Sequence, residues 1–347
     1  MLKSALLIPL LAVLSVPIQA GGSIGFREID LPDPAGDRPL HVGVWYPTVD
    51  DSPTTTVGEN RVFYGVSAIK NAKPADDDAH PLVVLSHGYG GSWRNLSWLA
   101  GELVAQGYVV AAPDHPGTTT FNRQPSEAAK LWERPHDLSR VIDALSGSAM
   151  PAGKIDSSRI AAIGHSLGGW TVAALAGARF DADRFSADCD AHPNPRTCGL
   201  SRELGIAAGV KADTPLDSDM KDARIEAVVS LDLGLARGLT PESLKAIRTP
   251  FLVVGAGIDI GDLPAKMESG YLAEYLPSDT SRFVEIADAM HFSFMQLCKP
   301  GAVALIEADT PGDGIVCKDG GARGREEIHR QVADMIIAFL AQAIPAK

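Results

Sequence analysis

The pattern Gly-x-Ser-x-Gly occurs twice in the chain, at residues 21–25 and 164–168. A serine in this pattern becomes a nucleophile when it lies on a tight turn between a buried strand and a helix, where small flanking residues avoid clashes. Only the second match has that context, because the apolar run at 160–163 precedes it and a small-residue stretch follows it. We therefore predict that Ser166 is a nucleophile and that the first match is a coincidence.

A serine hydroxyl needs a general base near neutral pH, and histidine is the natural choice. For a serine on such a turn, the acid and then the base follow it along the chain. Three histidines follow Ser166. His192 lies in a cysteine-containing loop close behind the serine, and His329 lies on the last predicted helix, where we expect it to face solvent. His291 directly follows a predicted strand, so we predict that it is the base.

An acid must orient the histidine and stabilise its charge, and it should end a strand between Ser166 and His291. Two aspartates meet this requirement. Asp259 follows the apolar run at 251–255 after a short loop, and Asp232 directly ends the run at 227–231. Adjacent strands end near the same edge of a sheet, so both are possible. We favour Asp259 and keep Asp232 as the alternative.

Acyl transfer also needs hydrogen-bond donors for the developing oxyanion. One expected donor is the backbone N–H of Leu167, directly after the serine, and the other is the N–H of Tyr89 in the glycine-rich segment 86–91. Trp93 and Trp170 are candidates for lining the substrate pocket, with packing in the core as the alternative for each aromatic ring.

Short apolar runs alternate with helical patterns along the rest of the chain, which indicates βαβ units and a mostly parallel central sheet with helices on both faces. The segment 50–79 is polar, and we expect it to be surface loop. The predicted strands are 24–31, 40–46, 81–86, 108–112, 159–164, 225–231, 250–255 and 282–286. The predicted helices are 94–106, 126–145, 167–178, 264–276 and 328–340, with a helix start at 240–242.

Two stretches, at about 179–224 and 298–324, do not fit the alternation, and we expect them to be insertions in a single domain that covers residues 21–347. They contain all four cysteines. Four cysteines allow three pairings. We predict two disulfides between the pairs closest in the chain, Cys189–Cys198 and Cys298–Cys317, which suits an exported protein. The chain has no Cys-x-x-Cys spacing, so the cysteines are not expected to form a zinc site.

The first 20 residues have the three-part pattern of a secretory signal peptide, with a positive start, an apolar run at 5–18 and small residues before Gly21. The run is too short to span a bilayer comfortably. We predict cleavage after Ala20, export to the periplasm or the medium, and no stable membrane insertion afterwards.

Composition supports a globular chain without polyanionic partners. The 347 residues include 45% hydrophobic and 21% charged residues, which excludes a largely disordered chain. The net charge of −12 argues against nucleic acid and against an anionic membrane surface, because phosphate binding needs a basic face.

These residues resemble the α/β-hydrolase superfamily. The resemblance rests on HGYGG at 87–91, GHSLGG at 164–169 and the late His291, and it covers most of the chain from about residue 81 onward. Within the superfamily the chain is similar to the platelet-activating-factor acetylhydrolase and predicted dienelactone hydrolase branch, through VWYP at 44–47, the GHSxGG pattern and HFS at 291–293.

The resemblance implies the α/β-hydrolase fold and metal-independent hydrolysis of carboxylic esters, often short-chain or lipid-like ones. Platelet-activating-factor acetylhydrolases place the acid where this chain has Asp232, whereas bacterial relatives with His-Phe-Ser place it where this chain has Asp259. True dienelactone hydrolases have cysteine at the position of Ser166, so dienelactone is not the expected substrate.

We therefore expect an exported serine hydrolase that cleaves small-molecule or lipid-like esters through an acyl-enzyme, without metal or cofactor. The alternatives keep the site and change the substrate to a lipid, a polyester or an amide. A non-catalytic exported binding protein is the alternative from another class.

Overall fold

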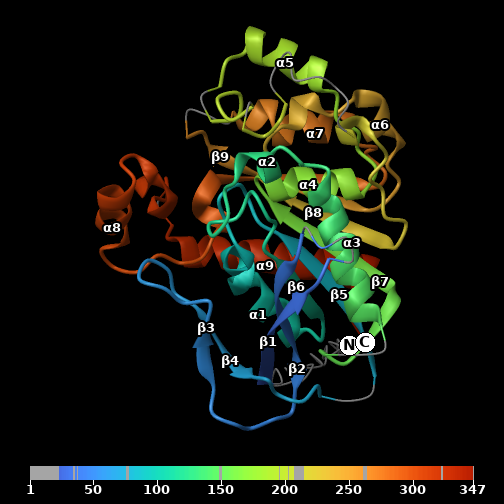
Figure 1. Ribbon diagram of the computed structural model, residues 1–347, viewed down its shortest axis with the longest axis vertical. Coiled ribbons are helices and arrows are strands. Elements are labelled where there is room, and N and C mark those ends of the chain that lie inside the picture. Colours follow the sequence, from blue (N-terminus) through green and yellow to red (C-terminus); the bar gives the residue numbers. More distant parts are fainter. Residues whose placement is uncertain are drawn as a thin grey trace, which may run out of the picture.

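A mostly parallel sheet forms the centre of the computed structural model (Figure 1). The structure describes residues 23–33, 36, 38–75, 78–147, 151–194, 196–201, 203–206, 215–260, 264–321 and 323–346. The predicted signal peptide at 1–20 lies outside these residues. Within them, the sheet has ten strands in the order β10-β9-β8-β7-β5-β6-β2-β1-β4-β3.

Six strands, β10, β9, β8, β7, β5 and β6, run parallel to one another, and β2 pairs antiparallel with both β6 and β1. This arrangement confirms the predicted fold class. The strands are β1 Ser23–Leu31, β2 Leu40–Thr48, β3 Thr55–Val57, β4 Val66–Lys70, β5 Ala79–Ser86, β6 Val109–Pro113, β7 Lys154–His165, β8 Ile225–Leu231, β9 Phe251–Ile258 and β10 Ser281–Met290.

Both faces of the sheet are buried under helices. In β5, Leu82 and Val84 enter the core on one face, while Val83 and Leu85 enter the core on the other. Helices α3 (Glu133–Ser146) and α4 (Leu167–Leu175) cover the first face, and α1 (Ser97–Ala105) and α9 (Arg325–Ala343) cover the second (Figure 1). Burial on both sides explains why the central strands are continuous apolar runs in the sequence.

The expected helix at 126–145 is split into α2 (Pro125–Ala128) and α3. Pro135 explains the break, because its ring clashes with a helical carbonyl four residues earlier and is tolerated only in the first turn. The expected loop at 50–79 contains the short strands β3 and β4. Strand β4 pairs with β1 and buries Ala68, but its apolar residues are too few to stand out in a polar segment.

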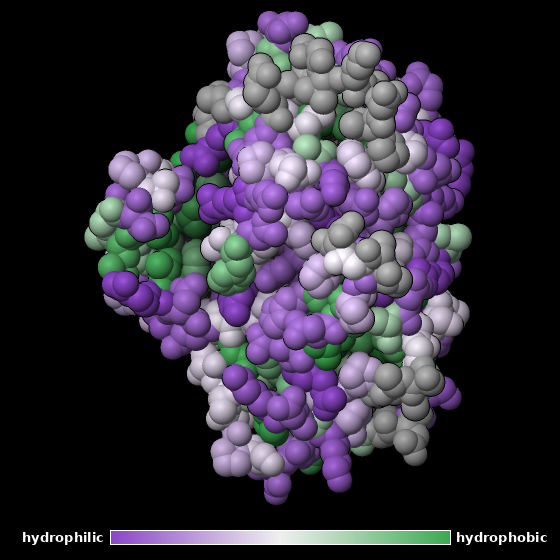
Figure 2. All heavy atoms as spheres, viewed as in Figure 1, coloured by the Kyte–Doolittle hydropathy of each residue, from purple (hydrophilic) through white to green (hydrophobic). Residues whose placement is uncertain are grey.

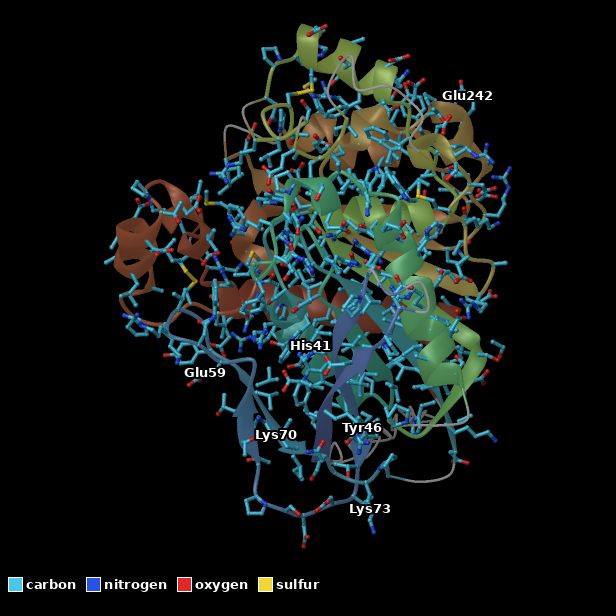
Figure 3. All side chains as sticks on the ribbon, in the orientation of Figure 1. His41, Tyr46, Glu59, Lys70, Lys73 and Glu242 are labelled. Carbon is cyan, nitrogen blue, oxygen red and sulfur yellow. A yellow bond between two sulfur atoms is a disulfide. The ribbon has the colours of Figure 1, made fainter. Side chains whose placement is uncertain are left out.

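The remaining helices lie on the later part of the chain. They are α5 Ala182–Ala191, α6 Pro241–Ala246, α7 Ser269–Tyr275 and α8 Ala302–Asp309. The structure confirms both predicted disulfides, Cys189–Cys198 beside α5 and Cys298–Cys317 beside α8 (Figure 3). Each bridge therefore closes a loop within one of the two irregular stretches.

The surface in view is mostly hydrophilic, as the net charge leads one to expect (Figure 2). Hydrophobic side chains gather on it over α8, where Leu305 is 40% exposed. Among the described helices, none has both the length and the apolar character needed to cross a bilayer.

Helix α9 offers a matched test of this packing. Ile336 is fully buried in the core between α9 and the sheet, whereas its neighbour Ile337 is only partly buried. We expect Ile336→Ala to lower the free energy of unfolding by about 2–5 kcal/mol, because it leaves a cavity in a close-packed core. Ile337→Ala should cost less than half as much in the same urea titration. Equal losses would contradict the placement of this helix.

Candidate active site

Ser166 lies on a strained turn between β7 and α4. Its backbone adopts φ 58° and ψ −122°, a region that L-residues rarely occupy. The flanking glycines are required by close contacts, since a Cβ on Gly164 would lie 2.0 Å from the carbonyl oxygen of Gly168. A Cβ on Gly168 would lie equally close, 2.0 Å, to the carbonyl oxygen of Ser86. The turn has the strand–turn–helix context that the sequence pattern predicts.

His291 begins the turn that follows β10, and its Nε2 lies 3.0 Å from the Oγ of Ser166. The carbonyl of His291 accepts a hydrogen bond from Nε2 of His165 at 2.8 Å. Burial and the neighbouring His291 lower the pKa of His165 well below its ordinary value, so this ring stays neutral. Both residues are at least 97% buried, with exposed fractions of 3% for His291 and 2% for His165. The hydrogen bond from His165 therefore fixes the backbone of His291, from which its imidazole extends.

Asp232 is the carboxylate that contacts His291. Its Oδ2 lies 2.7 Å from Nδ1 of His291, and its Oδ1 accepts a hydrogen bond from the N–H of Ala256 at 2.9 Å. The carboxylate therefore favours the tautomer with a proton on Nδ1, which leaves Nε2 free to accept the proton of Ser166.

This geometry corrects our preference for Asp259. Strand β8, which ends at Asp232, pairs directly with β7, whereas β9 lies one strand further from Ser166. Asp232 also has a positive φ of 44°, so the chain turns sharply where β8 ends. Asp259 lies just beyond the end of β9.

The other two histidines after Ser166 lie elsewhere. His192 is exposed at the end of α5 and contacts Asp188. The expectation that His329 faces solvent is wrong, because its ring stacks on Trp98 with centroids 3.7 Å apart and is 6% exposed. Burial lowers the pKa of His329 to about 3, and its Nε2–H donates to the carbonyl of Ser293.

The two expected oxyanion donors lie beside the serine. Leu167 is the first residue of α4, and the glycine-rich segment 86–91 packs so closely that a Cβ on Gly88 would lie 3.0 Å from the Cβ of Ser166. The N–H of Gly90, next to Tyr89, is already bound to the carbonyl of Thr118. Within the described part of the chain, the N–H groups of Leu167 and Tyr89 have no acceptor. Both are therefore available to a negatively charged oxygen.

A cavity of about 140 Å³ opens beside the serine. Its wall is mainly apolar and includes part of the insertion that contains Cys189 and Cys198. We call residues 196–201 and 203–206 of this insertion the roof segment. Of the lining residues, the sequence patterns pointed only to Tyr89, Ser166, Leu167 and His291 as site residues. The lining residues are Tyr89, Ser166, Leu167, Arg196, Thr197, Leu200, Leu204, Gly234, Leu235, His291 and Phe292.

A side-chain contact ties the roof segment to the glycine-rich segment 86–91, which we call the oxyanion segment. The hydroxyl of Tyr89 donates to Oε1 of Glu203. Burial and the Glu203 carboxylate raise the pKa of the Tyr89 hydroxyl, so it stays protonated as a donor. Among the lining residues, the guanidinium of Arg196 lies 5.7 Å from the centroid of the Phe292 ring.

Trp93 and Trp170 do not line this cavity, which corrects our expectation for both. Trp93 is 2% exposed and packs against Phe26 and Trp45 on one face of the sheet. Trp170 is completely buried and meets Phe180 edge-on. Large apolar rings gain most by entering the core, and here both rings do so.

Within the described residues, no group of three or more histidine, cysteine, aspartate or glutamate side chains is arranged to hold a metal ion.

The fold and the serine turn agree with a family match. A model of the alpha/beta hydrolase family matches residues 83–304, and the chain belongs to this family. The solved ferulic acid esterase from Streptomyces cinnamoneus has a similar fold, with a TM-score of 0.65, 20% identity, and coverage of 97% of this chain and 93% of that one. The resemblance to the platelet-activating-factor acetylhydrolase and dienelactone hydrolase branch stays a prediction.

Curated relatives match parts of the chain. Cutinase est1 of Thermobifida alba is 31% identical over 227 residues, which are 63% of this chain and 56% of that protein. A bis(hydroxyethyl) terephthalate hydrolase of Streptomyces coelicolor is 26% identical over 248 residues, which are 71% of this chain and 59% of that protein. The chain spans between 32% and 59% of the length of the curated relatives that it matches.

The contact between Asp232 and His291 can be tested without knowing the substrate. We expect Asp232→Asn to slow the labelling of Ser166 by a fluorophosphonate about 10³–10⁴-fold, because an amide favours the wrong tautomer of His291. Asp259→Asn is the matched control and should label at the wild-type rate. If Asp259→Asn slows the labelling strongly and Asp232→Asn does not, Asp232 is not the acid that orients His291. Labelling is followed by mass spectrometry at equal folded concentration.

Proposed function

We propose that this protein is a serine hydrolase that cleaves carboxylic esters through an acyl-enzyme. The observation that carries the proposal is the hydrogen-bonded series Ser166–His291–Asp232, with contacts of 3.0 Å and 2.7 Å. The cutinases and the terephthalate ester hydrolase among its relatives support ester chemistry. The rival reading, a non-catalytic binding protein, does not explain why a strained turn presents a serine to a buried histidine.

In the first half of the reaction, Oγ of Ser166 attacks the ester carbonyl while its proton moves to Nε2 of His291. Asp232 stabilises the resulting imidazolium through Nδ1. The oxyanion lies against the N–H groups of Leu167 and Tyr89. His291 then returns the proton to the leaving alcohol, and the acyl group remains on Ser166.

In the second half, water enters and His291 takes one of its protons as it attacks the acyl-enzyme. The same two N–H groups stabilise the second oxyanion. The tetrahedral intermediate collapses, the proton returns to Oγ of Ser166, and the carboxylic acid leaves. No other reactant is needed for this cycle.

The cavity favours a compact ester. Its volume of about 140 Å³ is small beside the pockets that enclose drug-sized ligands, and four of its lining residues are leucines. We assign short-chain or otherwise compact acyl esters as the first substrate class. Polyester is the second candidate, because several relatives bear the name cutinase. We also infer export to the periplasm or the medium, which the two disulfides support.

A chain-length series of p-nitrophenyl esters tests the activity. We expect acetate and butyrate esters to be cleaved with the highest kcat/KM, and Ser166→Ala to lose about 10⁴–10⁶-fold in kcat, because the nucleophile is missing. A fluorophosphonate should label the wild type and not the variant. If the folded wild type neither hydrolyses any ester nor reacts with the fluorophosphonate, the proposed function is wrong and the hypothesis of a non-catalytic binding protein is favoured.

The roof segment should set the acyl chain length. Leu200 lines the cavity and is only partly buried, so Leu200→Ala widens the cavity at little cost in stability. We expect kcat/KM for octanoate relative to acetate to rise about 10-fold, the range that one or a few methylene groups control in an apolar pocket. Leu305→Ala, on the distant helix α8, is the matched control. An unchanged ratio in Leu200→Ala would show that another wall limits the acyl group.

A further inference from the structure

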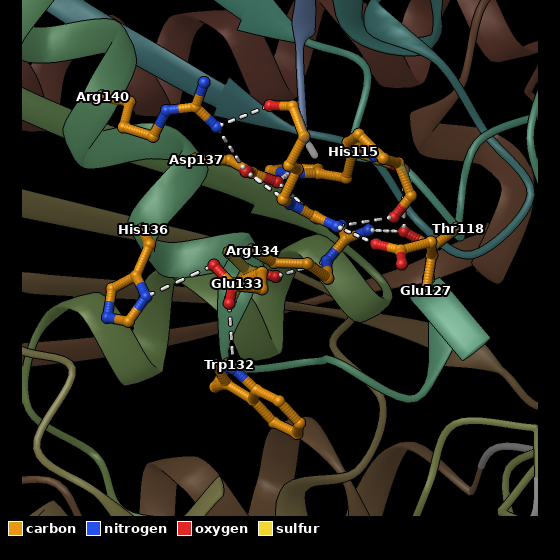
Figure 4. A network of polar contacts seen from close by, with 12 residues as sticks. His115, Thr118, Glu127, Trp132, Glu133, Arg134, His136, Asp137 and Arg140 are labelled. Carbon is orange, nitrogen blue, oxygen red and sulfur yellow. Dashed lines mark hydrogen bonds and ion pairs between the residues drawn. The ribbon is translucent and has the colours of Figure 1, made fainter. Parts of the chain in front are cut away.

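A buried polar network that includes His115, Arg134 and Asp137 takes no part in the mechanism above (Figure 4). Nδ1 of His115 lies 2.9 Å from Oδ2 of Asp137, and its Nε2 lies 2.9 Å from Oγ of Ser86. Ser86, His115 and Asp137 thus repeat the order serine–histidine–aspartate. All three are completely buried, so no substrate can reach this second serine.

The hydrogen bonds assign the protons of this network. The carboxylate of Asp137 accepts two bonds from Arg38, at 2.8 Å and 2.7 Å, and one from Nδ1–H of His115. Burial, together with Arg134 and Arg38, lowers the pKa of His115 well below its ordinary value. The ring is therefore neutral, and its Nε2 accepts a hydrogen bond from the hydroxyl of Ser86.

Arg134 on α3 connects this network to the oxyanion segment. Its Nη2 donates to Oγ of Ser86 at 3.2 Å and to the carbonyl of His87. Its Nη1 donates to the hydroxyl of Thr118, whose own carbonyl accepts the N–H of Gly90. Each of these contacts holds backbone on one side or the other of Tyr89.

His87 fixes the same segment from within. Its Nε2 accepts the backbone N–H of His115 at 3.0 Å, so its proton is on Nδ1, which donates to the carbonyl of Gly88 at 2.7 Å. The N–H of Gly91 donates to that carbonyl as well. The peptide groups before and after Tyr89 therefore have fixed orientations. Among the described residues, no acceptor binds the N–H of Tyr89.

Arg134 also reaches the second donor. Its Nε donates to Oγ1 of Thr171 at 2.9 Å, and the same hydroxyl donates to the carbonyl of Leu167 at 2.9 Å. Thr171 is completely buried on α4, one turn after Leu167. One guanidinium group thus makes hydrogen bonds that lead to both oxyanion donors.

We propose that Arg134 is a positioning residue that sets the spacing between the N–H groups of Tyr89 and Leu167, with the Ser86–His115–Asp137 series holding it in place. An oxyanion hole works because its donors are fixed before charge develops. A single planar group with five donors suits this task, since its hydrogen-bond directions are rigid. The proposal rests on the proposed ester hydrolysis and deepens it.

The test compares matched oxygen and sulfur substrates. In a thionoester, the developing negative charge sits on sulfur, which is a weaker hydrogen-bond acceptor than oxygen. Turnover of the thionoester therefore depends less on the oxyanion hole. A variant with displaced donors should lose activity on the oxoester and keep more of it on the thionoester, whereas general damage to the fold lowers both rates equally.

The key variant is Thr171→Val, which removes the hydroxyl and keeps the shape of the side chain. We expect its kcat on the oxoester to fall about 10–100-fold, somewhat less than the 10²–10³-fold for complete loss of a donor. KM should stay near the wild-type value, because the interaction is made only in the transition state. Thr171→Ser retains the hydroxyl and should restore the wild-type ratio of oxoester to thionoester turnover.

Arg134→Lys keeps the charge and loses the planar fork, and we expect the same loss of the oxoester preference. Should this variant fail to fold, Thr171→Val and Thr171→Ser decide the question. Equal losses on both substrates, a change confined to KM, or a wild-type ratio in Thr171→Val would each overturn the proposal. A wild type without ester turnover would instead overturn the proposed function, so the two failures are distinguishable.

Discussion

The turn at Ser166 is the constraint on which the other parts of the site depend. Its unusual backbone conformation costs on the order of 1–3 kcal/mol, and it persists only where the surroundings enforce it. The N–H of Ser166 donates to the carbonyl of Leu231 at 3.0 Å, and its own carbonyl accepts the N–H of Gly234 at 3.3 Å. Strand β8 therefore holds the turn from one side, while the contact between Gly168 and Ser86 limits it from the other.

The same contacts explain why the site residues converge. Gly168 can lie against Ser86 only because it lacks a side chain, and this approach brings the end of β5 beside the start of α4. Strand β8 bonds to the turn and continues directly into Asp232. The sheet thus brings Ser166, the proposed acid Asp232 and the oxyanion segment together through neighbouring strands, as parallel strands do at their carboxyl ends.

Patterns of local spacing were sufficient for part of this site. The sequence predicts Ser166 and His291 as nucleophile and base because each directly follows an apolar run, and the structure brings their side chains within 3.0 Å of each other. The two disulfides were predictable because each pair closes a short loop. The choice between Asp232 and Asp259 depended on strand order, which the apolar runs do not encode. The network around Arg134 joins residues from the end of strand β5, from separate loops and from helices α3 and α4. Trp93 and Trp170 could equally have faced a pocket or the core. Such contacts depend on side-chain packing in three dimensions.

The division between core and insertion bears on how such an enzyme can change its substrate. The proposed nucleophile, base and acid come from ends of core strands. Much of the cavity wall, in contrast, comes from the roof segment, which the disulfide Cys189–Cys198 links to α5. Loops tolerate substitution better than the elements they connect, so the wall can vary while the chemistry stays. The two are not independent, however, because Glu203 of the roof segment accepts the hydroxyl of Tyr89, whose backbone N–H is a proposed oxyanion donor. A change in the roof segment that displaces Tyr89 would therefore alter the rate of the chemical step as well as the choice of substrate.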